Sequence, residues 1–140
     1  RVQCASPAYI EKHGAPTCGD DLVLQKHSCL LLRYPGADEF YWTLQVNGVP
    51  QRYDFTGPLE SDDGEVLTTW ALAGSGIINK PVFEIAEFLE SGALVRVAAN
   101  TPPTDVPFAC IYPHKRLQDP KIKTFIEYIV KECKDVLSIG

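Results

Sequence analysis

One histidine and one cysteine stand at a spacing that could place a general base beside a nucleophile. His27 and Cys29 are two residues apart, so their side chains would point to the same face of a strand. A cysteine nucleophile also needs a group that orients its base and surroundings that lower the pKa of the thiol. The sequence shows no such group nearby, and Cys29 lies in an apolar run. We therefore interpret Cys29 as a buried structural thiol and predict neither catalytic residues nor an enzyme.

An acidic cluster and a glycine pair are the candidates for metal or phosphate chemistry. The acidic residues at 60–65 lack the spacing of a calcium loop, and helix capping explains them better. Gly74 and Gly76 lie between a predicted helix and a predicted strand, which is the wrong order for a phosphate-binding helix N-terminus. The five cysteines form no CxxC pair and no cluster with zinc-ligand spacing. The sequence therefore predicts no metal and no cofactor.

Two predicted helix starts could instead hold an anion. Ser6 precedes Pro7, and Ser61 precedes Asp62, so each start combines a hydroxyl with free backbone N–H groups. The same residue types are common helix caps, which is the structural interpretation. The residues by themselves leave both interpretations open.

The segment 62–97 sets the fold class. Asp62, with Glu65 three residues later, has capping-box spacing and predicts the start of a helix. A short apolar strand, a second helix that Pro81 begins, and another strand follow. This alternation predicts an α/β fold.

Three further elements complete the expected order. Asn47 and Gly48 form the favoured two-residue turn of a β-hairpin. Residues 108–112 are expected to form a strand, with Cys110 buried. Residues 120–137 have the clearest helical period, with an apolar face opposite charges of alternating sign. Because that face needs a cover, we expect this segment to pack on the preceding lobe or to pair with a second copy.

Three segments carry a resemblance to a known family. LysR-type transcriptional regulators have an effector-binding domain whose signature resembles ALAGSGIINKPVFEIAEFLESGALVRV, residues 71–97. The opening of that domain's second lobe is similar to RVQCASPAYIEKHGAP, residues 1–16. The strand and helix that return to its first lobe resemble residues 108–130. The resemblance covers residues 2–133 in the family's order and spacing.

The resemblance implies a fold and a division into lobes. The fold would be a type II periplasmic-binding-protein-like lobe, a mixed sheet flanked by helices. Residues 1–100 would form the second lobe of the effector-binding domain. Residues 101–140 would return through the hinge as a strand and helix of the first lobe, which otherwise has no counterpart here. Since the chain also lacks methionine, we expect it to be a piece of a longer protein.

The resemblance also implies a function and a binding site. A small metabolite, commonly a carboxylate, would bind in the cleft between the lobes and shift the regulator between conformations, which changes DNA binding and transcription. In the family, the effector contacts the hinge strand, the start of the helix after the hairpin, and the Gly-Ile turn. At matching positions the ligand-binding residues would be Cys4, Ser6, Glu60, Ser61, Asp62, Gly76 and Ile77.

Composition limits the partners and the location. The net charge of −5 over 140 residues, with an isoelectric point near 5.1, argues against a nucleic-acid surface. DNA would therefore be bound only through an N-terminal helix-turn-helix that has no counterpart in this sequence. No apolar run approaches the ~18–20 residues of a membrane span, so no membrane contact is expected. A cytoplasmic homo-oligomer is implied, a dimer or swapped dimer for this chain and a tetramer for the full-length regulator.

Two alternatives share the fold class. A periplasmic solute-binding protein of a transporter would be secreted, whereas the odd number of cysteines is typical of free thiols in a reducing compartment. A redox-sensing regulator of the same family would need a disulfide. Cys18 and Cys29 are the pair within reach in one lobe, and peroxide would have to oxidise them.

Overall fold

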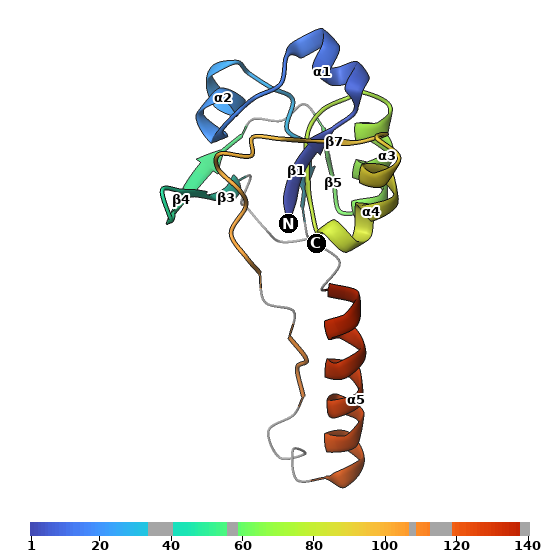
Figure 1. The fold of residues 1–140 in the computed structure, drawn as a ribbon. Coiled ribbons are helices and arrows are strands. Elements are labelled where there is room, and N and C mark those ends of the chain that lie inside the picture. The colour runs from blue at the N-terminus through green and yellow to red at the C-terminus, as the bar shows by residue number, and fades with distance from the viewer. Residues whose placement is uncertain (34–40, 56–58, 107–108, 113–118, 138–140) are drawn as a thin grey trace. The chain divides into compact units, whose positions relative to one another are not determined.

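The computed structural model describes residues 1–33, 41–55, 59–106, 109–112 and 119–137, drawn in colour in Figure 1. The chain divides into two compact units, Arg1–Asp105 and Val106–Gly140. The assignment of the C-terminal segment to another lobe stays a prediction.

The central strand of the first unit is β1 (Val2–Ala5). It pairs antiparallel with β6 (Ile78–Lys80) on one side and with β7 (Val95–Val97) on the other. Gln3, Cys4 and Ala5 are buried. The strand is therefore enclosed on both edges and both faces, which suits an apolar strand of an α/β fold.

A second pair of strands joins this group through one backbone contact. β2 (Leu31–Leu32) and β5 (Glu60–Ser61) are parallel to each other. The Ile77 N–H donates to the Ser28 carbonyl at 2.8 Å, and the Leu30 N–H donates to the Ile77 carbonyl at 2.8 Å. These bonds place β2 beside and parallel to β6. The strand order is therefore β7, β1, β6, β2, β5, and the prediction of a mixed sheet is confirmed.

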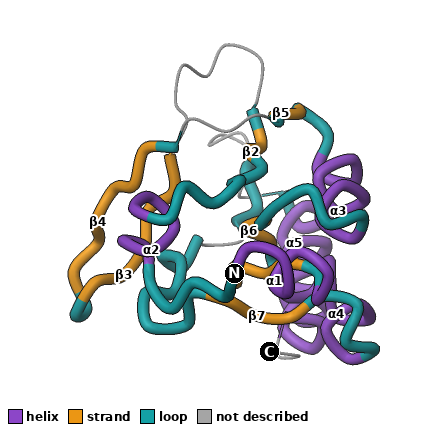
Figure 2. The backbone as a smooth tube through the Cα atoms, turned by 90° about the horizontal axis from the view of Figure 1, so that it is seen from above, coloured by secondary structure: helices purple, strands orange, loops and turns teal. Residues whose placement is uncertain are grey.

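Helices lie on both sides of this sheet. α1 (Pro7–His13) follows β1, and α2 (Gly19–Leu24) lies on the same side as the hairpin described below. α3 (Gly64–Leu72) and α4 (Val82–Glu90) lie together on the other side. Figure 2 shows the same division from above, with β2 and β6 between the two groups.

Neighbouring residues of the strands point to two separate cores. Leu30 and Ile78 belong to the core that includes Leu67 of α3, whereas Leu31 and Ile77 belong to the core of α2 and the hairpin. The alternation follows from the two-residue period of a strand. Each strand near the Ile77 contact thus stabilises both layers.

The hairpin forms where the sequence predicts it. β3 (Tyr41–Val46) and β4 (Val49–Asp54) pair antiparallel in a six-residue register. Asn47 and Gly48 have φ angles of 52° and 79°, both positive as the type I′ turn requires.

The second unit contains α5 (Pro120–Leu137), with the bounds expected from its period. The strand expected at 108–112 is not found in the described residues. Residue 108 lies outside them, and residues 109–112 form no strand. Cys110 is exposed, so the prediction of its burial is wrong. An apolar run is buried as a strand only where another strand pairs with it, and none does among the described residues.

Gly76 allows the contact between β2 and β6, and its replacement tests that contact. A Cβ atom at this position would lie 2.3 Å from the Ser28 carbonyl oxygen, which Ile77 needs as its acceptor. We expect Gly76→Ala to lower the free energy of unfolding by about 1–3 kcal/mol, the usual cost of overpacking. The measurement is the urea midpoint at unchanged slope.

The matched control is Gly64→Ala. The atom nearest its Cβ would be the Lys80 Nζ at 2.7 Å, the far end of a flexible side chain. Alanine also favours a helix over glycine by up to about 1 kcal/mol. Equal losses of stability in the two variants would contradict the role given to Gly76.

Candidate functional site

The parallel strands β6, β2 and β5 end at one edge of the sheet, here called the carboxyl edge. Because β1 runs antiparallel, its first residue, Val2, lies at the same edge and pairs with Lys80. α3 begins at Gly64, shortly after β5 ends, so its N-terminus is also close to this edge. Ligands of open α/β sheets bind outside the carboxyl ends of the strands. The carboxyl edge is therefore the place to look for a site.

A cavity of about 140 Å³ lies at the carboxyl edge. The polar residues of its lining are Tyr41, Asn79, Lys80 and Arg1. The remaining lining residues are apolar: Leu30, Leu31, Leu32, Trp42, Leu67 and Ile78. Polar and apolar residues thus share the lining, and small-molecule sites contain both kinds of residue.

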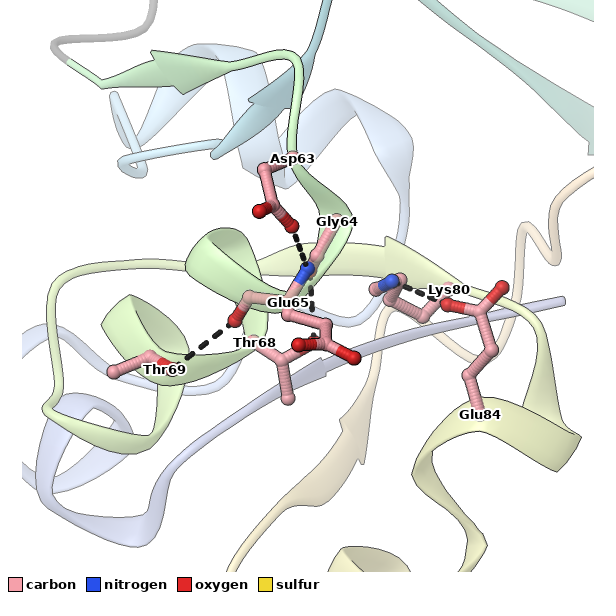
Figure 3. A network of polar contacts seen from close by, with 7 residues as sticks. All are labelled: Asp63, Gly64, Glu65, Thr68, Thr69, Lys80 and Glu84. Carbon is pink, nitrogen blue, oxygen red and sulfur yellow. Dashed lines mark hydrogen bonds and ion pairs between the residues drawn. The ribbon is translucent and has the colours of Figure 1, made fainter.

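Charged side chains lie close to one another at the starts of α3 and α4 (Figure 3), and one of these residues, Lys80, also lines the cavity. Lys80 is only 7% exposed, and its ammonium forms an ion pair with Glu84 in the first turn of α4. The same ammonium lies against the backbone of Gly64, the first residue of α3. The lysine therefore carries its charge at the end of a strand and between two helix N-termini, where positive potential adds up.

The cap of α3 differs from the predicted one by one residue. Asp63 directly precedes the helix with an extended backbone, and its Oδ1 accepts from the Glu65 N–H at 2.8 Å. Ser61 Oγ in turn accepts from the Asp63 N–H at 3.0 Å. Asp62 lies one position too early to do this, so the prediction that it caps the helix in a capping box is wrong. Asp62 is exposed instead.

Three of the seven predicted ligand residues lie at the carboxyl edge. Glu60 is exposed and forms an ion pair with Arg33 at 2.9 Å. Ser61 and Asp62 follow it into the start of α3. These side chains lie between the end of a strand and a helix N-terminus, within the region where a ligand could bind.

The other four predicted ligand residues lie in the interior of the lobe. Cys4 and Ile77 are fully buried in the sheet, and Gly76 is buried beside Ser28. Ser6 is at the opposite end of β1, where its Oγ accepts from the Tyr9 N–H and caps α1. The structure does not bring these four to the carboxyl edge, and their part in binding stays a prediction.

Sequence reasoning did not single out the polar residues that line the cavity. Lys80 ends the apolar run before Pro81 and shares a strand face with Ile78. A lysine on the buried face of a strand was the signal that could have identified it, because lysine is rarely buried unless it is paired.

The His27–Cys29 pair forms no catalytic arrangement. Both ring nitrogens of His27 lie within hydrogen-bonding distance of a neighbouring side chain. Nδ1 is 3.1 Å from the Tyr9 hydroxyl, and Nε2 is 3.2 Å from the Gln25 Oε1. Burial lowers the pKa of His27 and raises the pKa of the Cys29 thiol to about 12. A thiol with that pKa stays protonated at neutral pH and is a poor nucleophile. The interpretation of Cys29 as a buried structural residue agrees with this geometry.

The described residues offer neither a candidate metal site nor a candidate membrane span. No group of three or more His, Cys, Asp or Glu side chains is arranged to hold a metal ion in that part of the chain. Nor does any helix there have the length and hydropathy of a membrane span.

Comparison with known sequences gives a family and several relatives. The family model described as "LysR substrate binding domain" matches residues 1–134. The HTH-type transcriptional activator TtdR of Escherichia coli K12 is 28% identical over 137 residues, which cover 98% of this chain and 43% of TtdR. The HTH-type transcriptional regulator DmlR of the same strain is 36% identical over 97 residues, which cover 69% of this chain and 31% of DmlR.

Solved structures with the same fold include two regulators. The full-length Vibrio cholerae virulence activator AphB, a member of the LTTR family, matches with a TM-score of 0.74 at 26% identity, over 94% of this chain and 44% of AphB. The regulatory domain of CrgA, a LysR-type transcriptional regulator from Neisseria meningitidis, matches with a TM-score of 0.68 at 26% identity, over 94% of this chain and 63% of that one.

The burial of two thiols predicts their reactivity. Burial also raises the pKa of Cys4 to about 12, although Arg96 and Lys80 lower it in part. We expect Cys4 and Cys29 to resist iodoacetamide at neutral pH until the chain is unfolded in urea, whereas the exposed Cys110 reacts in the native chain. Peptide mass spectrometry after timed alkylation measures this. Equal rates at Cys29 and Cys110 in the native chain would contradict the burial described here.

Proposed function

The chain belongs to the LysR substrate-binding-domain family, and we propose that it senses a small metabolite within a bacterial transcriptional regulator. It spans less than half the length of the curated relatives TtdR and DmlR. Regulation of transcription is therefore proposed for a longer protein that contains this chain. The observation that supports sensing most directly is the cavity at the carboxyl edge, because its lining combines apolar residues with the cationic residues Arg1 and Lys80.

The proposed mechanism is closure of two lobes on the metabolite. The carboxyl edge would form one wall of a cleft, and a first lobe outside these residues would form the other. A metabolite that binds the closed state more tightly than the open state shifts the population toward the closed state. A shift from mostly open to mostly closed requires a large difference in affinity, about 10⁴-fold for a change from 1:99 to 99:1.

The predicted ligand residues take two roles in this proposal. Glu60, Ser61 and Asp62 lie at the carboxyl edge, where they can contact a ligand or a closing lobe. The buried Cys4, Ser6, Gly76 and Ile77 would act by positioning the sheet that carries the site.

The proposed role is non-enzymatic, and it implies further partners. DNA would bind through a helix-turn-helix outside residues 1–140, which relatives named HTH-type regulators support. A regulator that binds chromosomal DNA in bacteria works in the cytoplasm. We also propose homo-oligomers, because α5 carries exposed large apolar residues, among them Phe125 and Tyr128.

The experiment starts from the gene that encodes this chain. We expect the coding sequence upstream of Arg1 to encode a helix-turn-helix domain. We also expect a reporter gene, placed behind a promoter that the full-length protein binds, to respond to a small carboxylate. Deletion of residues 1–105 removes the carboxyl edge. We therefore expect it to lower the carboxylate-induced reporter activity at least tenfold.

A gel-shift assay with the same promoter is the control, because DNA binding by the helix-turn-helix should survive the deletion at least in part. Two results would contradict the proposal. One is a secretion signal in place of the helix-turn-helix, and the other is a metabolite response that the deletion leaves unchanged.

A further inference from the structure

A buried tyrosine and a buried histidine form a hydrogen-bonded pair away from the carboxyl edge. Tyr9 belongs to α1, which follows the far end of β1, and His27 precedes β2. Tyr9 is 2% exposed and His27 is 9% exposed. The Tyr9 hydroxyl lies 3.1 Å from His27 Nδ1 and accepts from the Ser28 N–H at 2.9 Å. Because the Ser28 carbonyl accepts from the Ile77 N–H, the pair connects α1 to the contact between β2 and β6.

The directions of these hydrogen bonds require a neutral imidazole. The Tyr9 oxygen accepts from the Ser28 N–H, and its single hydrogen can be donated to His27 Nδ1. On the other side of the ring, Nε2 lies 3.2 Å from the Gln25 Oε1, which is an acceptor. Nε2 therefore carries the hydrogen and Nδ1 carries the lone pair. A proton on Nδ1 would make that nitrogen a donor toward the tyrosine, and the Tyr9 O–H would lose its acceptor.

The groups around the pair also oppose protonation of His27. Burial lowers the pKa of His27, and so does the positive charge of His13, which stacks on the tyrosine ring with 4.6 Å between the centroids. Asp21 on α2 raises the pKa of His27, but its Oδ2 already accepts two hydrogen bonds from Thr17, at 2.7 and 2.8 Å. Cys29 stays protonated near neutral pH, because burial raises its pKa to about 12. Burial and a second histidine thus outweigh the single carboxylate.

The backbone holds the imidazole beside the tyrosine. α2 ends in a Schellman motif, in which the Lys26 N–H donates to the Val23 carbonyl at 3.1 Å. In the same motif the His27 N–H donates to the Leu22 carbonyl at 3.0 Å. The exposed Lys26 has a φ of 54°, in the left-handed region that residues other than glycine rarely adopt. Because such strain persists only while the surrounding contacts impose it, loss of the bond to the tyrosine would let this turn relax.

We propose that Tyr9 and His27 form an acid-sensitive latch. While the imidazole is neutral, the pair holds α1 to the segment 27–28. A proton on Nδ1 sets two donors against each other and releases the segment. Acid then loosens the link between β2 and β6, because the released segment carries the Ser28 carbonyl. The latch adds a response to pH that goes beyond the proposed metabolite sensing, since neither residue of the pair lies at the carboxyl edge.

An NMR titration of the ¹⁵N-labelled 140-residue chain, from about pH 8 to about pH 5, tests the latch. At the upper end, the imidazole nitrogens of His27 should show the Nε2–H tautomer. The pKa of His27 should lie below the ~6.5 of an ordinary histidine. The Ser28 amide should shift with the same midpoint, because its acceptor is the hydroxyl that faces Nδ1.

The same proton should also lower the stability of the chain in acid. His27 has a lower pKa in the folded chain than in the unfolded chain. Below about pH 6.5 the unfolded chain therefore binds more protons, and the unfolding equilibrium constant rises by up to about tenfold per pH unit. His27→Asn keeps an oxygen acceptor close to the position of Nδ1 but does not titrate, so this variant should lack that part of the pH dependence. Urea midpoints of both proteins over the same pH range measure the difference.

Two further substitutions separate the latch from the general effect of a lost hydroxyl. Tyr9→Phe removes the donor that favours the neutral imidazole, so the pKa of His27 should rise by roughly 0.5–1. Tyr53→Phe removes another buried hydroxyl, which donates to the Asp20 Oδ1 at 3.0 Å. This control should leave the pKa of His27 unchanged.

Three results would overturn the latch. The first is the Nδ1–H tautomer of His27 in the native chain at pH 8, and the second is a His27 pKa at or above its ordinary value. The third is an equal dependence of the urea midpoint on pH in the wild-type chain and in His27→Asn. If that variant does not fold, the tautomer and the pKa in the wild-type chain decide, because they need no substitution.

Discussion

The backbone contact between Ile77 and the segment 28–30 is the interaction on which the first unit depends. Two hydrogen bonds of 2.8 Å connect the strands β6 and β2, and through them the group around β1 is joined to the pair β2 and β5. Gly76 makes the approach possible, because any Cβ there would meet the Ser28 carbonyl. The contact also fixes which residues face each core, since Ile77 and Ile78 point to opposite sides of the sheet.

The same contact produces the candidate site. It brings the carboxyl ends of the parallel strands to one edge, where the start of the antiparallel β1 and the N-terminus of α3 also lie. Lys80 reaches this edge because it is the last residue of β6, two positions after Ile78 on the same face. Its ammonium then lies between Glu84 and the backbone of Gly64, beside the cavity. Backbone pairing in the sheet thus sets the charge of a surface that the proposed function uses.

Local signals in the sequence predicted the local structure. The turn at 47–48, the cap at Ser6 and the period of α5 each depend on residues within a few positions of one another, and the structure has all three. The cap predicted for α3 was one residue too early. Asp62 and Asp63 have the same side chain, and only the backbone angles distinguish them. The cavity, and Lys80 in it, depend on pairing between residues nearly fifty positions apart, which no local pattern encodes.

Amide hydrogen exchange of the native chain tests the central claim most directly. If the contact holds the sheet together, the Ile77 and Leu30 amides open only when the whole first unit unfolds. They should then exchange as slowly as the amides of β1, and far more slowly than those of the edge strand β4. Exchange of Ile77 and Leu30 at the rate of β4, while β1 stays protected, would contradict the account. In that case β2 and β5 would open independently of β1, and the carboxyl edge would not be a fixed site.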